Sequence, residues 1–225
     1  MKRLFAIVAL LMCVGFVGSV SAQDLQKNIV GVRAGVNIST MGIKVLMFNA
    51  NMSSKLGYNA GVSYERLLLK KAPLYLETGL YYSNKGFKGG LSILEETDQN
   101  AAKCNLGYLQ VPLMINYKFI IKDVFAITPS AGFYYAFGVI GRMKEVYDLG
   151  AGMVTEVWDV YADDTLRRSD LGYRCGLSLS WKDIVLGFAY EGSMMNILKP
   201  EAYDDELFGL KAHNSNFTIS LGYNF

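Results

Sequence analysis

Five charged side chains stand out because they interrupt segments built otherwise from apolar and small residues. They are Arg33, Glu65, Glu77, Arg174 and Glu191, and Asp170 lies close to Arg174 in the sequence. A charged side chain that is removed from water without a partner costs free energy. If the fold encloses these groups, we therefore expect a paired network that fills the interior rather than an ion pathway. In particular, we expect Arg33 to pair with Glu65, Glu77 or both.

Hydrolytic catalysis would need a different set of residues. His213 is the only histidine, Ser215 follows it, and the acids before it are Asp204, Asp205 and Glu206. A histidine beside a hydroxyl and a carboxylate can activate a nucleophile. However, the spacing alone does not bring these groups together, and a lone histidine in a polar stretch is usually solvated. We expect no catalytic residue and no enzyme, with a lipid-modifying or hydrolytic enzyme as a further alternative.

The cysteines and the net charge limit which other kinds of site the chain can have. Cys104 and Cys175 are too few for a disulfide framework and match no metal-binding spacing, so we expect no metal and no cofactor. A single bridge would require the fold to bring these two residues together. The chain has 22 basic and 20 acidic residues, and it becomes neutral without Lys2 and Arg3. It therefore lacks the basic footprint of a nucleic-acid-binding protein.

The segments that carry the charges alternate with a period of two residues, which predicts strands. At the end of the chain Phe217, Ile219, Leu221, Tyr223 and Phe225 alternate with small polar residues. Tyrosine and tryptophan often end the apolar faces, as rings at a lipid interface do, while glycine and serine on the opposite faces suit a narrow interior. The alternation recurs over residues 30–39, 58–65, 74–83, 109–117, 125–138, 171–181, 184–190 and 217–225.

The connectors between these segments are alternately long and short, which is typical of a membrane barrel. The pattern predicts an all-β fold, an eight-stranded antiparallel up-and-down transmembrane β-barrel with short periplasmic turns and long extracellular loops. Segment 30–39 should pair with 217–225 to close the sheet. Pro112 and Pro129 should mark bulges or points where pairing stops on one side. The long connectors are 40–55, 84–106, 140–169 and 194–214, and within them 142–168 is expected to form a hairpin above the membrane.

The first residues predict export. Lys2 and Arg3 precede an apolar run, and Val20-Ser21-Ala22 offers a cleavage site, so we expect a signal peptide over 1–22 and a single barrel domain over 23–225. The expected location is the outer membrane of a Gram-negative bacterium, as a monomer among outer-membrane lipid and lipopolysaccharide. The aromatic last strand, 217–225, resembles the signal that barrel-assembly machinery reads, so this machinery is an expected partner during biogenesis.

Several stretches resemble PorT-like outer-membrane β-barrel proteins. They are Gly107-Tyr108-Leu109-Gln110-Val111-Pro112, Asp170-Leu171-Gly172-Tyr173, Tyr190-Glu191-Gly192, Asn196-Ile197 and the terminal Leu221-Gly222-Tyr223-Asn224-Phe225. The resemblance implies the same barrel. Because the founding member is associated with secretion of proteins that carry a carboxy-terminal sorting domain, it also implies an accessory role in secretion as an alternative function.

The main functional expectation is a non-catalytic barrel with a lumen filled by side chains and a structural or loop-mediated interaction role. The segments 86–103 and 43–48 mix apolar and charged residues, and exposed loops on a rigid scaffold are a common place for binding. Through these loops the chain would meet a secretion-system or extracellular partner. Loops that only shield the mouth or lie against lipopolysaccharide are the other reading.

Overall fold

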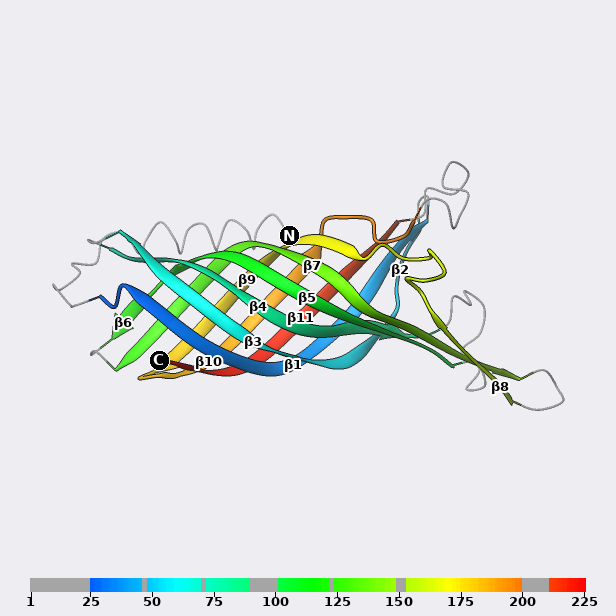
Figure 1. The fold of residues 1–225 in the computed structure, drawn as a ribbon, viewed down its shortest axis with the longest axis horizontal. Coiled ribbons are helices and arrows are strands. Elements are labelled where there is room, and N and C mark those ends of the chain that lie inside the picture. Colours follow the sequence, from blue (N-terminus) through cyan, green and yellow to red (C-terminus); the bar gives the residue numbers. More distant parts are fainter. Residues whose placement is uncertain are drawn as a thin grey trace.

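The computed structural model describes residues 25–45, 48–69, 72–89, 101–121, 124–148, 153–199 and 211–225, so the expected signal peptide lies outside the described residues. These residues form long antiparallel strands that wind obliquely around a common axis (Figure 1). The strands are β1 (Asn28–Val45), β2 (Phe48–Asn51), β3 (Ser53–Leu69), β4 (Ala72–Lys88), β5 (Ala101–Tyr117), β6 (Phe119–Ile121), β7 (Phe125–Asp148), β8 (Met153–Asp159), β9 (Ser169–Trp181), β10 (Ile184–Ser193) and β11 (Lys211–Asn224).

Eight of these strands close into a hydrogen-bonded ring. The order is β1, β3, β4, β5, β7, β9, β10 and β11, and β11 then pairs with β1. The closing ladder runs from Gly31 opposite Asn224 to Lys44 opposite Lys211, and the Phe225 amide donates to the Val30 carbonyl at 2.8 Å. The predicted eight-stranded antiparallel barrel and its closure are therefore confirmed. Among the described residues, no helix is long and apolar enough to span a membrane.

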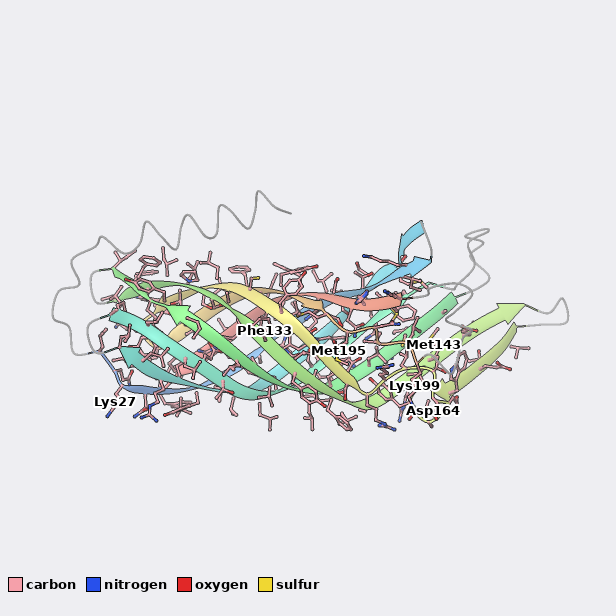
Figure 2. The ribbon with its side chains drawn as sticks, turned by 90° about the horizontal axis from the view of Figure 1, so that it is seen from above. Lys27, Phe133, Met143, Asp164, Met195 and Lys199 are labelled. Atoms are coloured by element: carbon pink, nitrogen blue, oxygen red, sulfur yellow. The ribbon has the colours of Figure 1, made fainter. Side chains whose placement is uncertain are left out.

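The two faces of the sheet have the predicted polarity. On β1, Val32 and Val36 are exposed on the outer face, whereas Asn37 and Ser39 are buried inside. Apolar side chains project outward along the ring, Phe133 among them (Figure 2). Since a barrel in a bilayer needs an apolar band on its outer face, this surface fits lipid.

The prolines coincide with gaps in the ladders. Between β4 and β5 the pairs on both sides of Pro112 keep one register, yet no pair forms at Val111 and Pro112. On its other side Pro112 still pairs with Tyr134. Pro129 pairs with Leu177 but has no partner in the β5 or β6 ladder. Because proline has no amide hydrogen to donate, pairing stops on one side of each proline. Of the two predicted alternatives, a bulge or a stop of pairing on one side, the second is therefore confirmed.

The ends with long connectors contain more strand than predicted. Residues 40–55 and 84–106 were expected as loops, but β1 continues to Val45, β3 starts at Ser53, β4 ends at Lys88 and β5 starts at Ala101. The reason is that polar residues continue these ladders, so each strand is longer than its apolar face. The hairpin predicted within 142–168 is confirmed, because Arg142–Asp148 of β7 pairs with β8. We call this end of the barrel the hairpin end and the end with Phe225 and the 182–183 turn the turn end; β8 projects beyond the ring in Figure 1.

An apolar cluster supports the hairpin end. Met41, Phe87, Cys104, Leu106, Tyr161, Leu166 and Ile197 are buried in it, and Met143 and Trp158 pack against it. Burial raises the pKa of the Tyr161 phenol, which lies in the turn after β8. A Cβ atom on Gly138 would lie 2.2 Å from the Tyr161 hydroxyl, so only glycine lets this ring approach the wall.

Candidate functional site

The centre of the barrel is closed around the Glu191 carboxylate, which β10 directs inward. Glu191 Oε2 lies 2.7 Å from Lys85 Nζ, and Arg174 Nη1 donates to Oε1. Gln110 Nε2 also donates to Oε1 at 2.6 Å, and Asn216 Nδ2 donates to Oε2 at 3.2 Å. These donors come from β4, β9, β5 and β11, so one carboxylate ties together opposite walls of the barrel.

Aromatic rings complete this central layer. Lys85 Nζ lies 4.5 Å from the centre of the Tyr134 ring and 5.8 Å from that of Tyr108. Both rings are almost fully buried, and Lys85 itself is 1 % exposed. A cation that is held between a carboxylate and ring faces is compensated although it has little contact with water.

A second charged group lies nearer the turn end. Lys118 Nζ is 2.7 Å from Glu65 Oε2, and Arg33 Nη2 is 3.9 Å from Glu65 Oε1. Arg33 also donates to Asn224 Oδ1 at 2.7 Å, which links it to the last strand. Lys118 lies 4.5 Å from the centre of the Tyr75 ring. Glu65 therefore has two cationic neighbours.

Glu77 is held differently. It stands directly opposite Glu65 in the β3–β4 ladder, where two like charges oppose each other. Asn116 Nδ2 donates to Glu77 Oε2 at 2.5 Å. Among the described side chains, no cation lies within ion-pair distance of Glu77, so the geometry brings Arg33 to Glu65 and not to Glu77.

Toward the hairpin end, Asp170 is fully buried and surrounded by donors. Ser193 Oγ donates to its Oδ1 at 2.6 Å, and Tyr134 and Asn214 each donate to Oδ2 at 3.3 Å. Asn37 holds the opposite wall, because it donates to Ser83 at 3.0 Å and accepts from Asn59 at 2.8 Å. Hydrogen bonds between side chains thus cross the interior at several heights.

The space beside the central layer is small. A cavity of about 60 Å³ lies between the central layer and the turn end, lined by Arg33, Glu65, Glu77, Asn116, Lys118 and Arg174 among others. Space of this size holds about four to six waters. At the level of the central layer the described interior is therefore a filled polar core.

The five interior charges named from the sequence all lie in this region, but they do not form one cluster. Arg174 and Glu191 belong to the central layer, whereas Arg33 and Glu65 meet at the turn-end group. Sequence reasoning missed Lys85 and Lys118, the two lysines that complete these groups. The available signal was the alternation itself, because Lys85 continues the inward series Tyr81, Ser83 on β4.

The residues considered for other chemistry lie elsewhere. His213 lies within strand β11 and not in a loop, at an outward position of that strand, and the acids 204–206 lie outside the described residues. Ser215 is within 3.4 Å of the Tyr190 hydroxyl. Cys104 is buried and Cys175 is half-buried, and both are free thiols, so the fold does not bring them into a bridge. Within the described ranges, no group of three histidine, cysteine or acidic residues could hold a metal.

The last strand combines closure of the ring with an exposed aromatic end. Phe225 is 67 % exposed, and its ring meets that of Tyr223 edge-on at 5.1 Å between centres. The other outward residues of this strand, Phe217, Ile219 and Leu221, face away from the interior.

The sequence model of the outer membrane protein beta-barrel domain matches residues 21–199. The chain belongs to this family. No curated protein matches this chain.

Solved structures similar to this family member include three small barrels. Ail of Yersinia pestis, in complex with the heparin analogue sucrose octasulfate, is 13% identical with a TM-score of 0.42, over 89% of this chain and 100% of Ail. Neisserial surface protein A is 11% identical with a TM-score of 0.42, over 88% and 97% of the two chains. OprG of Pseudomonas aeruginosa is 11% identical with a TM-score of 0.46, over 89% and 96%.

Proposed function

We propose that this outer-membrane barrel neither conducts nor catalyses, and that it acts as a rigid support for interactions made at its hairpin end. The observation that carries the proposal is the closed central layer, in which Glu191 binds Lys85, Arg174 and Gln110 from three other strands. The charges of the central layer are paired with one another, so none of them is free to guide an ion. The remaining surface with room for function is outside the membrane.

The construction of the hairpin end supports this role. Strands β7 and β8 leave the wall as a paired ladder, and the apolar cluster beneath them holds Met143 and Trp158. On the other side of the ladder Val157 is 62% exposed. A hairpin fixed at its base and exposed at its surface presents binding residues with little loss of conformational entropy. Its partner would be a protein or a glycan outside the cell.

Catalysis is not part of the proposal, because the described side chains offer no activated nucleophile. His213 has an outward position on β11, and the hydroxyl nearest to it in sequence, that of Ser215, is shared with Tyr190. The interior carboxylates are each bound by amides or cations. Acid–base chemistry needs a group that is free to exchange a proton with a substrate.

Site-specific photocrosslinking in cells tests the interaction role. A crosslinking amino acid at Val157 should give a discrete protein or glycan adduct. Leu221 is a matched control, since it is 61% exposed on the wall that we assign to lipid, and it should give lipid adducts only. Equal adduct patterns at the two positions would contradict an interaction role for the hairpin end.

The resemblance to PorT-like proteins favours a second candidate function, an accessory role in secretion across the outer membrane. It rests on the stretch 107–112 and on the terminal Leu221-Gly222-Tyr223-Asn224-Phe225. A deletion strain separates the candidates. Loss of secreted proteins alone favours the secretion role, altered lipid A favours an enzyme, and intact secretion with altered permeability or adhesion favours the interactive barrel.

A further inference from the structure

Three lysines form a row across three neighbouring strands at the hairpin end. Lys88 of β4 pairs with Lys103 of β5, and Lys103 pairs with Lys144 of β7. All three are exposed on the outer face. They are brought together by a register shift between Gly107 and Tyr108, without which Lys103 would stand opposite Met143.

Such a row is unfavourable in isolation. Neighbouring strands are about 4.8 Å apart, and like charges directly opposite each other are destabilising. Arg142 adds a fourth cation on the same face, two positions before Lys144. Among the described residues, no carboxylate forms an ion pair with these four, although Asp159 stands opposite Arg142 in the β7–β8 ladder. We call Lys88, Lys103, Arg142 and Lys144 the basic strip.

The height of the basic strip indicates what neutralises it. The outer face of β5 is apolar up to Leu109, and Lys103 lies six residues beyond it, about 20 Å along the strand. With a strand tilt of about 40°, this is roughly 15 Å along the barrel axis. Arg142 stands just above the exposed Ile140, at the edge of the apolar band. Arg142 stands opposite Asn105, two residues below Lys103, so the whole strip lies within about 5 Å of height, above the apolar band.

We propose that the basic strip binds the phosphate groups of lipopolysaccharide molecules that surround the barrel. The proposal rests on the function proposed above, because it places the hairpin end on the outer side of the membrane. A phospholipid carries its phosphate at the edge of the apolar band, below the lysine row. Lipopolysaccharide carries anionic groups on its lipid part and also on the sugars above, at the level of the strip. Charge-assisted hydrogen bonds from ammonium and guanidinium groups to phosphate are among the strongest available.

Binding of purified lipopolysaccharide to the full chain, refolded in uncharged detergent micelles, tests this proposal. The strip variant is Lys103→Gln with Lys144→Gln. The matched control is Lys27→Gln with Arg66→Gln, which removes two exposed cations from the turn end, where Figure 2 labels Lys27. We expect the strip variant to bind about ten- to thirtyfold more weakly than wild type, since each cation at a membrane surface contributes about 1 kcal/mol. The control should bind as wild type does.

Three further probes identify the source of the phosphate. Enzymatically dephosphorylated lipopolysaccharide should bind wild type as weakly as intact lipopolysaccharide binds the strip variant. Phosphatidylglycerol and millimolar inorganic phosphate should compete poorly. Equal binding by wild type and strip variant, an equal loss in the control, or equal binding of phosphatidylglycerol would overturn the proposal. Val157 stands opposite Lys144, so only a protein adduct there counts for the function proposed above. A failure of lipopolysaccharide binding leaves such an adduct unaffected, so the two proposals fail separately.

Discussion

At the residue scale, the central layer that fills the lumen depends on Glu191. Its carboxylate is the acceptor for Lys85, Arg174, Gln110 and Asn216. Glu191→Gln keeps the shape but leaves the buried Lys85 and the half-buried Arg174 without their counter-charge, so we expect a loss of about 3–5 kcal/mol in the free energy of unfolding. Urea titration in detergent, followed by tryptophan fluorescence, measures it. Glu156→Gln on the exposed hairpin should change stability by less than about 0.5 kcal/mol.

The partner of this carboxylate gives a sharper residue-scale test. Lys85→Met should also destabilise, because it leaves Glu191 with one cation. Combining it with Glu191→Gln removes both buried charges of the pair, so the double variant should lose clearly less than the sum of the two single losses. Additive losses would mean that the 2.7 Å contact between the two groups carries no coupling.

At the element scale, the hairpin end depends on the contact of the Tyr161 ring with the barrel wall. A Cβ atom on Gly138 would lie 2.2 Å from the Tyr161 hydroxyl. Gly138→Ala should therefore displace the ring and cost about 1–3 kcal/mol, while combination with Tyr161→Leu should relieve most of that cost. Faster proteolysis of the hairpin than of the wall is the expected signature in limited digestion. Unchanged stability in Gly138→Ala would contradict this packing.

The last strand is the element that we expect the assembly machinery to read. Deleting Phe225 removes one backbone hydrogen bond, from its amide to Val30, worth about 1 kcal/mol. The folded barrel should therefore survive, while machinery-assisted insertion into proteoliposomes slows. Phe225→Leu keeps the backbone bond and separates the ring from the amide. Normal insertion kinetics for the deletion would count against a signal role.

The strands also show what their sequence could and could not predict. The period of two predicted every wall strand and its outward face, since residues such as Val32 and Val36 have only lipid to contact. The same pattern predicted strands that are too short, because the ladders continue beyond the apolar faces with polar residues that are typical of loops. Lys85 was therefore missed as an interior cation. The lysine row depends on a one-residue register shift at Gly107, which no local pattern encodes.

At the scale of the whole molecule, a closed ring of eight strands leaves a lumen that side chains fill. An interior cavity of about 60 Å³ lies on one side of the central layer. The long strand β7 and its partner β8 extend beyond the ring at the hairpin end (Figure 1). Function is expected at that end and not through the lumen.

Single-channel recording in planar bilayers tests the sealed lumen most directly. The refolded full chain, inserted at a density confirmed by labelling, should give no stable conductance steps in molar salt, whereas a porin inserted in the same way gives them. Glu191→Gln should give at most brief openings, because it weakens the central layer without removing its side chains. Stable, long-lived conductance steps in the wild-type protein would contradict the account.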